Sequence, residues 1–253
     1  MHFYDDQLRY VYCRIGKNAN TNWRRTLLML SGNYTRYGRP ELIPRRLVHS
    51  RRYMDKHIKR LEKLQPDERD WRQRKYYKFL FVREPLQRLL SAYRDKLVVN
   101  NGYGNVDVAI VRKYRPHDYS PAVKRYKTTF AEFIRHILDE HAAGRVLDRH
   151  WLPQSKLCSV CDPPFDFVGH LETLHADAQF VVTILKSRIH DKRQRQRVEN
   201  VTFPAERGDS KTNDLMKQMY ATIPATDIQA LYSLYAVDYA LFGFKHPDVT
   251  GFP

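Results

Sequence analysis

The stretch "FLFVREPLQRLLSAYRDKL", residues 79–97, joins two kinds of structure at Pro85. Residues 79–82 are an apolar run typical of a buried strand, and the apolar residues after Pro85 recur at helical spacing. We predict a strand over residues 78–83 and a helix that begins at residue 85. Arg83 would then stand at the strand end, where ligands bind in open α/β sheets, and its planar guanidinium suits a phosphate. Ser91 would reach the same anion only if the helix packs back over the strand end, and the alternative is a solvated arginine.

Composition places the chain among folded, strongly basic proteins. Its 253 residues are 42% hydrophobic and carry a formal net charge of +16. That length fits one domain, and we predict a single domain over residues 1–253. The charge favours an anionic partner: nucleic acid, an acidic membrane surface, an acidic polysaccharide, or a phosphorylated or sulfated small molecule. No apolar run is long enough to span a bilayer and no signal peptide is visible, so taken literally the chain reads as soluble.

Short strands alternate with helices along the chain. Strands are predicted at 10–15 and 165–172, and helices at 21–30, 130–141 and 174–190. Thr129 and Glu132 form a capping box before the second of these helices. This alternation predicts an α/β fold with a parallel sheet.

Other segments give weaker signals. We expect a charged helix near residues 52–64 and a mobile loop over residues 105–127. Thr226 with Gln229 is expected to cap one final helix, "DIQALYSLYAVDYALF", at residues 227–242.

The loop "GKNAN", residues 16–20, is a candidate anion site because it lies between a predicted strand and a predicted helix. The start of a helix presents unpaired N–H groups and a positive dipole end, which bind anions. Lys17 adds a charge, and Thr21 and Asn22 add side-chain donors. The loop lacks the full pattern of nucleotide triphosphatases, so an ordinary exposed turn stays the alternative.

Taken together, "KNANTNWRR" and "FLFVREPLQRLLSAYRDKL" resemble the two nucleotide-binding motifs of the Golgi carbohydrate sulfotransferases. The closest branch acts on chondroitin, dermatan, GalNAc-terminated glycans and the HNK-1 epitope. Further similarity lies in "HWLPQSKLCSVCDPPFDFVGHLETL", residues 150–174, and in "YAVDYALFGF", residues 235–244. The chain departs from the family pattern at Gly16, where a proline is usual, and at Asn20, where a cysteine is usual. The second departure removes a potential disulfide partner and would leave Cys13 free.

The resemblance implies a P-loop-like sulfotransferase fold, with a mostly parallel central sheet flanked by helices. It also implies an enzyme that uses 3′-phosphoadenosine 5′-phosphosulfate (PAPS) as sulfate donor, without a metal. Lys17 would neutralise charge on the bridging oxygen, and Arg83 with Ser91 would hold the 3′-phosphate, supported by Arg88 unless that residue only faces solvent. The 5′-phosphosulfate would lie against the segment that follows the first strand, with these residues at the site: Lys17, Asn18, Ala19, Asn20, Thr21, Asn22 and Trp23.

Sulfate transfer to a sugar hydroxyl also needs a base, and histidine is the natural acceptor near neutral pH. His49, in "LVHS", is our first candidate because it precedes the Arg83 strand, as the proposed base does in the related uronyl 2-O-sulfotransferases. His150, in "DRHW", is the second. "CSVC", residues 158–161, could form half of a zinc site, but a disulfide from either cysteine to a distant partner is favoured.

The resemblance implies a glycosaminoglycan or GalNAc-containing acceptor and a Golgi-luminal location behind an N-terminal membrane anchor, which this sequence does not show. Two other classes of protein are disfavoured by the sequence. A P-loop-type kinase is disfavoured because no magnesium-binding Ser or Thr follows Lys17. A nucleic-acid-binding protein is disfavoured because no known module signature is evident.

Overall fold

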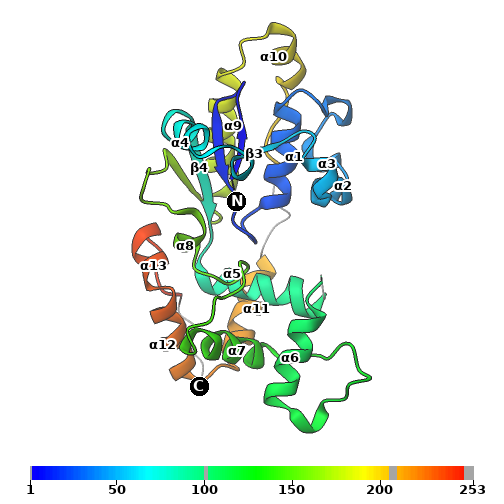
Figure 1. The fold of residues 1–253 in the computed structure, drawn as a ribbon, viewed down its shortest axis with the longest axis vertical. Helices are drawn as coiled ribbons and strands as arrows, with labels where there is room; N and C mark the ends of the chain where they lie inside the picture. The colour runs from blue at the N-terminus through cyan, green and yellow to red at the C-terminus, as the bar shows by residue number, and fades with distance from the viewer. Residues whose placement is uncertain (1, 100–101, 205–209, 248–253) are drawn as a thin grey trace. The chain divides into compact units, whose positions relative to one another are not determined.

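The computed structural model describes residues 2–99, 102–204 and 210–247. The chain folds into two compact units, each made of two segments (Figure 1). Unit 1 consists of Met1–Arg83 and Lys156–Arg207, and unit 2 consists of Glu84–Ser155 and Gly208–Pro253.

Unit 1 is built on a five-stranded sheet with the strand order β3-β1-β2-β4-β5. The strands are β1 (His2–Asp5), β2 (Tyr10–Cys13), β3 (Lys59–Arg60), β4 (Tyr77–Val82) and β5 (Phe167–His170). β2, β4 and β5 run parallel, whereas β1 pairs antiparallel with both β2 and β3. The α/β class is confirmed, with a parallel core and an antiparallel edge that the sequence did not predict.

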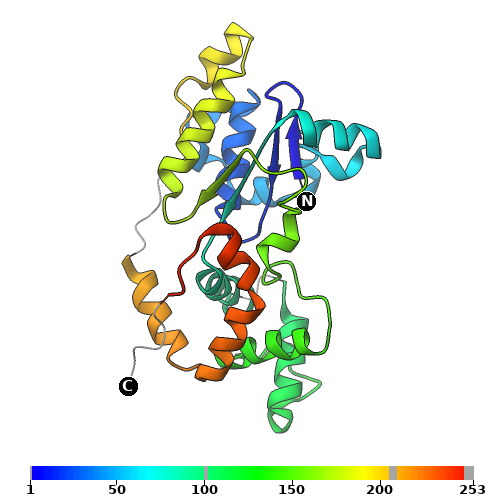
Figure 2. The same ribbon diagram turned by 90° about the vertical axis from the view of Figure 1, so that its left-hand side faces the viewer.

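Five helices of unit 1 bury the main core against one face of this sheet (Figures 1 and 2). They are α1 (Asn20–Leu30), α2 (Arg45–His49), α3 (Arg51–Met54), α9 (Leu174–Ser187) and α10 (Lys192–Val198), whereas α4 (Pro66–Lys75) lies on the other face and adds no buried residue. Phe79 and Phe81 of β4 point into this core, together with Trp23 of α1 and Val181 of α9. Alternate strand residues face opposite sides of a sheet, and Val11 accordingly joins a smaller cluster with Leu61 on the other face.

The charged helix predicted near residues 52–64 is wrong. α3 ends at Met54, and the chain then forms the short strand β3 and a 3-10 turn, Leu61–Lys63. Leu61 is fully buried in the small cluster, so packing of this side chain overrides the helical propensity of its charged neighbours. The charged helix is instead α4, which begins at Pro66 with two acidic residues in its first turn.

Unit 2 is helical over the residues that the structure describes. Its helices are α5 (Pro85–Tyr93), α6 (Gly104–Tyr114), α7 (Phe130–Ala142), α11 (Ser210–Tyr220), α12 (Ala225–Leu234) and α13 (Ala236–Phe242). A π-helical segment, Arg94–Val98, extends α5, and α8 (Gln154–Cys158) crosses the boundary between the units. The core of unit 2 joins Leu89 of α5, Phe133 of α7 and Leu231 of α12.

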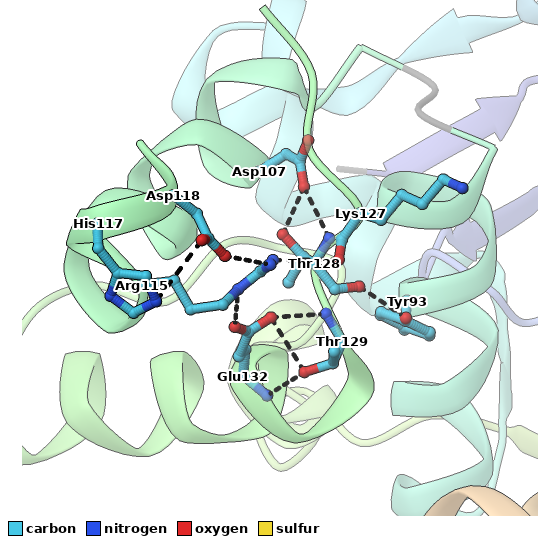
Figure 3. Close-up of polar contacts among 9 residues, drawn as sticks. All are labelled: Tyr93, Asp107, Arg115, His117, Asp118, Lys127, Thr128, Thr129 and Glu132. Atoms are coloured by element: carbon cyan, nitrogen blue, oxygen red, sulfur yellow. Dashed lines mark hydrogen bonds and ion pairs between the residues drawn. The ribbon is translucent and has the colours of Figure 1, made fainter. Parts of the chain in front are cut away.

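The mobile loop predicted over residues 105–127 is also wrong. Most of its first half is helix α6, and buried Asp107 on that helix accepts hydrogen bonds from the backbone N–H and the hydroxyl of Thr128 (Figure 3). Asp107 also accepts the backbone N–H of Tyr126. A nearby ion pair joins Arg115 to Glu132 at 2.6 Å. These contacts fix the segment that leads into α7.

Cap predictions had mixed outcomes. Thr129 and Glu132 form the predicted capping box at the start of α7. The cap predicted at Thr226 is wrong, because the N-cap of α12 is Pro224 and no side chain caps that helix start. The single final helix is two helices, α12 and α13, which meet at Tyr235. The Tyr235 hydroxyl hydrogen-bonds the buried backbone carbonyl of Trp151, a contact that no local pattern reveals.

Candidate functional site: the β2–α1 loop and the start of helix α1

The loop between β2 and α1 has two left-handed residues just before a helix start. Lys17 and Ala19 adopt left-handed conformations with φ values of 73° and 51°. Alternation of left- and right-handed residues turns successive N–H groups toward one concave side, where anions bind. Ala19 is the N-cap of α1 and makes no side-chain cap, so the first turn of that helix takes no hydrogen bond from its N-cap side chain.

Two asparagines hold this loop in place. Asn18 is fully buried, and its Nδ2 donates to the backbone carbonyl of Phe81 in β4 at 2.7 Å. Asn20 closes the loop on itself, because its Nδ2 donates to the carbonyl of Ile15 at 3.1 Å. Asn20 thus provides a loop-closing hydrogen bond at the position where the resemblance leads one to expect a cysteine.

The Asn18 contact also relates the loop to Arg83. β2 and β4 are parallel neighbours, with Cys13 opposite Leu80, so both strands end at the same edge of the sheet. The β2–α1 loop follows one strand end, and half-buried Arg83 follows the other. Unit 1 therefore carries Lys17 and Arg83 on loops at one sheet edge.

The helix start brings Thr21 to His49. The Thr21 Oγ1 lies 2.9 Å from Nε2 of His49, a residue 28 positions later at the end of α2. Two arginines of α1 position that segment: NH1 of Arg24 donates to the carbonyl of Val48 at 2.5 Å, and Nε of Arg25 donates to the carbonyl of Ile43 at 2.8 Å. The structure thus places the first candidate base beside the predicted phosphosulfate loop.

Trp23 does not belong to that loop surface, contrary to the sequence prediction. Its side chain is fully buried, and its ring packs against those of Tyr12, Phe79, Phe81 and Phe203 with centroids 4.8–5.6 Å apart. Its backbone N–H donates to the carbonyl of Ala19 inside the helix. Trp23 supports the loop from within the core, whereas Asn22 is half-buried at the helix start.

The other predicted residues lie in unit 2. Ser91 is half-buried on α5, and Arg83 is the last residue of unit 1, so one phosphate shared by these two side chains stays a prediction. Arg88 does not face solvent: it is 1% exposed, and its guanidinium donates to the backbone carbonyls of Leu152 and Arg149 at 2.8 and 2.9 Å. His150 lies within the loop that Arg88 holds, and a direct contact of Arg88 with a nucleotide stays a prediction.

Comparison with known proteins places this arrangement in a family. The model of the "Sulfotransferase family" matches residues 1–245, which include the β2–α1 loop and the Arg83 segment. The chain belongs to the sulfotransferase family. The family that the two motifs predicted is therefore confirmed.

Its relatives include several carbohydrate sulfotransferases. The chain is 33% identical to carbohydrate sulfotransferase 12 of Mus musculus over 96% of the chain and 60% of that protein. It is 33% identical to carbohydrate sulfotransferase 14 of Homo sapiens, over 97% of the chain and 60% of that protein. Carbohydrate sulfotransferase 10 of Danio rerio is 34% identical to the chain over 97% of the chain and 66% of that protein. The chain thus spans about three fifths of the length of the first of these relatives. No solved structure matches it.

The cysteines of this family member correct one prediction. Cys13, at the end of β2, forms a disulfide with Cys158, and Cys161 is free and exposed. Cys13 is therefore not left free by the departure at Asn20. The bond also removes the Cys158 thiolate that a zinc half-site would need. Across residues 2–99, 102–204 and 210–247 no group of three or more His, Cys, Asp or Glu side chains could hold a metal ion. Within the same ranges no helix has the length and apolar character required to cross a membrane.

The closing motif "YAVDYALF" also has a role that sequence reasoning missed. Asp238 is fully buried and accepts the backbone N–H groups of Gln154 and Ser155 at 2.7 and 2.9 Å, which caps the start of α8. The Tyr239 hydroxyl donates to Glu84 at 2.5 Å, and Glu84 caps α5. The resemblance drew attention to this motif but could not say that it holds the helix starts of unit 2.

Proposed function

We propose that this chain transfers a sulfuryl group from PAPS to a hydroxyl of a glycan. One observation carries the proposal. A loop with two left-handed residues, one of them Lys17, precedes α1, and the first turn of that helix places Oγ1 of Thr21 2.9 Å from Nε2 of His49. An anion-binding backbone, a cation and a proton acceptor are the groups that sulfuryl transfer requires.

The residues of unit 1 fit the donor. Lys17, the backbone N–H groups of residues 18–22 and the Thr21 hydroxyl would hold the 5′-phosphosulfate, because a helix start and a concave run of N–H groups favour a divalent anion. Arg83 would hold the 3′-phosphate, since a guanidinium binds phosphate oxygens in pairs. Ser91 would add a hydroxyl to that phosphate, as the motif predicts.

The step itself is an in-line displacement at sulfur. The acceptor oxygen forms a bond to sulfur while the bond from sulfur to the bridging oxygen of the donor breaks, and its electron pair leaves with 3′,5′-ADP. His49 takes the proton of the sugar hydroxyl, and Lys17 neutralises the negative charge that develops on the bridging oxygen. His150 is the alternative proton acceptor.

The acceptor is proposed by analogy with the relatives, whose names identify them as carbohydrate sulfotransferases. A chondroitin- or dermatan-type or GalNAc-containing glycan suits a chain with a net charge of +16 when that glycan is anionic. We also propose that residues 1–253 act as one catalytic domain, since the family match runs through both units. We propose a location in the Golgi lumen from the motif resemblance alone.

Retention on immobilised 3′,5′-ADP tests the donor assignment. We expect the folded chain to bind this resin, to elute with free 3′,5′-ADP, and to lose retention in the Arg83→Ala variant. A chain that ignores the resin but binds ATP would favour the kinase alternative, and one that binds only DNA would favour a nucleic-acid-binding protein. Either result would contradict the proposed function.

A further inference from the structure

Unit 2 contains a polar cluster outside the loop described above. Nδ1 of His150 lies 2.7 Å from Oδ1 of Asp148 and 2.7 Å from the hydroxyl of Tyr103. The same hydroxyl lies 3.0 Å from Oδ2 of Asp148. The Tyr103 ring stands edge-on to the imidazole, with centroids 5.5 Å apart. Three side chains from two segments therefore meet at one nitrogen of His150.

The carboxylate decides which nitrogen carries the proton. A lone pair on Nδ1 facing a carboxylate oxygen at 2.7 Å would be repulsive, so Nδ1 must carry a hydrogen and donate it to Asp148. The Tyr103 hydroxyl then donates its own hydrogen to the second carboxylate oxygen. A neutral imidazole with a proton on Nδ1 has its lone pair on Nε2, and no residue that the structure describes hydrogen-bonds this nitrogen.

The backbone around His150 is held from several directions. The carbonyl of Arg149 and that of Leu152 accept from Arg88, and the carbonyl of Trp151 accepts from Tyr235. The N–H of His150 itself donates to Asp148 at 2.8 Å. All of these bonds use backbone groups of residues 149–152, so the fold fixes the position and direction of Nε2 of His150. A fixed acceptor atom is what a binding site requires.

The electrostatics keep the imidazole neutral. Burial lowers the pKa of His150, and the nearby charges of Lys96 and Arg149 act in the same direction, while Asp148 opposes them. For Asp148, burial opposes ionisation, but the hydrogen bonds from His150 and Tyr103 lower the pKa of the carboxyl overall. At neutral pH the cluster thus presents a neutral Nε2 acceptor with cations close by.

We propose that Nε2 of His150 accepts a hydrogen bond from a hydroxyl of an acidic glycan, with Asp148 and Tyr103 as positioning residues. This inference rests on the proposed function for the class of ligand, because a sugar offers hydroxyl donors that a neutral imidazole can accept. Arg149 is exposed and supplies positive charge for a uronate or sulfate on the same glycan. Lys96 lies 5.0 Å from the Tyr103 ring, but its side chain is mostly buried and pairs with Asp95 at 3.4 Å, so we assign it no direct contact with the glycan.

Asp148→Leu is the decisive variant. Without the carboxylate, the Tyr103 hydroxyl, 2.7 Å from Nδ1, donates to that nitrogen, which moves the imidazole proton to Nε2 and turns the acceptor into a donor. We expect calorimetry with an unsulfated chondroitin hexasaccharide to show binding weaker on the order of tenfold, the loss of about one hydrogen bond. Tyr103→Phe should weaken binding less, because Asp148 still orients the ring. The affinity for 3′,5′-ADP should stay at the wild-type value in both variants.

Unit 2 provides a matched control pair. Asp139 on α7 accepts from the Tyr114 hydroxyl at 2.8 Å, and its side chain is 34% exposed against 32% for Asp148. Asp139→Leu and Tyr114→Phe therefore make the same chemical changes at a carboxylate–tyrosine pair that contacts no histidine nitrogen in the structure described. Both should bind the hexasaccharide as the wild type does.

A direct readout of the tautomer completes the test. Long-range proton–nitrogen correlation of ¹⁵N-histidine-labelled protein should show the proton of His150 on Nδ1 in the wild type and on Nε2 in Asp148→Leu. The inference is overturned if the wild-type proton is on Nε2, if Asp148→Leu binds the hexasaccharide at full strength, or if neutral chitohexaose binds as tightly as the acidic glycan. A wild type that binds no chondroitin also overturns it, whereas failure to bind 3′,5′-ADP alone would instead refute the proposed function.

Discussion

Asn18 and Asn20 show how single residues shape the β2–α1 loop. Asn18 hydrogen-bonds β4, and Asn20 closes the loop by donating to the carbonyl of Ile15. Lys17 therefore holds its left-handed conformation between two anchored residues, Ile15 and Asn18. Gly16 and Asn20, which depart from the family pattern, therefore lie in a loop that its own hydrogen bonds define. The charge of Lys17 then becomes the property to test.

Lys17→Ala should lower the turnover of sulfate transfer by about 10²- to 10³-fold, the effect of removing one group that stabilises charge in a transition state. The side chain is half-buried in a loop and contributes no core packing, so thermal unfolding should be unchanged. Lys56→Ala, at an exposed lysine of the same unit, is the control and should keep full activity. Full activity of Lys17→Ala would refute the role of this lysine.

His49→Ala should lower turnover by about 10²- to 10⁴-fold, the usual contribution of a general base. The affinity for 3′,5′-ADP, measured by calorimetry, should stay within about twofold of the wild type, because the phosphate-binding groups are untouched. His190→Ala removes an exposed histidine of unit 1 and serves as the control. A wild-type rate for His49→Ala would move the base to His150.

The candidate residues were predictable to different degrees. Lys17, Thr21 and His49 came from motif and spacing, and the fold brings the last two into contact across 28 positions. Trp23 was misassigned because a motif does not say which of its residues face the core. Tyr103 carries no local signal, because it meets Asp148 and His150 only across 45 and 47 positions, whereas Asp148 lies two residues before His150.

Among the elements, Asp6 connects three that are far apart in the chain. This residue follows β1, and its carboxylate accepts from Lys59 of β3, from Arg72 of α4 and from Tyr76, at 2.7–2.8 Å. Burial acts to raise the pKa of Asp6, but these three hydrogen bonds outweigh it and lower the pKa from 3.8 to about 2. The charged form therefore fastens α4 to the edge of the sheet.

Asp6→Asn should reduce the free energy of unfolding at pH 7 by about 1 kcal/mol, after allowance for solvent screening of a partly exposed group. Because the pKa is lower in the folded state, this stabilisation is present above pH 4 and disappears as the pH falls toward 2. Urea unfolding of wild type and variant at several pH values measures the difference. Asp70→Asn, on the exposed Asp70–Arg74 pair of α4, should change little at any pH. A difference that persists unchanged at pH 2 would contradict the account.

Element prediction succeeded where one pattern dominates. β4 and α5 were predictable because an apolar run and a helical apolar spacing meet at a proline, and α7 because its capping box is complete. β1 was not predictable, because its structure depends on pairing with β2 and β3. The 52–64 segment was not predictable either, because burial of Leu61 decides its structure. Helices α12 and α13 share one apolar pattern, and Tyr235 separates them through a tertiary contact with Trp151.

The whole molecule is defined by its charge and by a long-range covalent link. The disulfide between Cys13 and Cys158 closes a span of 145 residues and joins both segments of unit 1. A net charge of +16 makes the protein attractive to polyanions at long range. Composition alone predicted that attraction, but the pairing of the cysteines required the fold.

Raising the ionic strength from about 0.05 M to about 0.3 M should increase the KM for a glycosaminoglycan acceptor by roughly tenfold, because salt screens attraction between separated charges. Turnover at saturating acceptor should change little, since the contacts at the reacting atoms are short. Initial rates over a range of acceptor concentrations at each salt level measure both quantities. A KM independent of salt would show that the positive charge does not serve acceptor binding.

The most direct test of sulfuryl transfer is the reaction itself. Radiolabelled sulfate from PAPS is offered with chondroitin, dermatan, heparan and GalNAc-terminated acceptors, and the products are mapped as disaccharides. We predict that the wild type labels a hydroxyl of at least one chondroitin-, dermatan- or GalNAc-type acceptor and that Lys17→Ala does not. No labelled product with any acceptor, from a chain that is folded, would contradict the account.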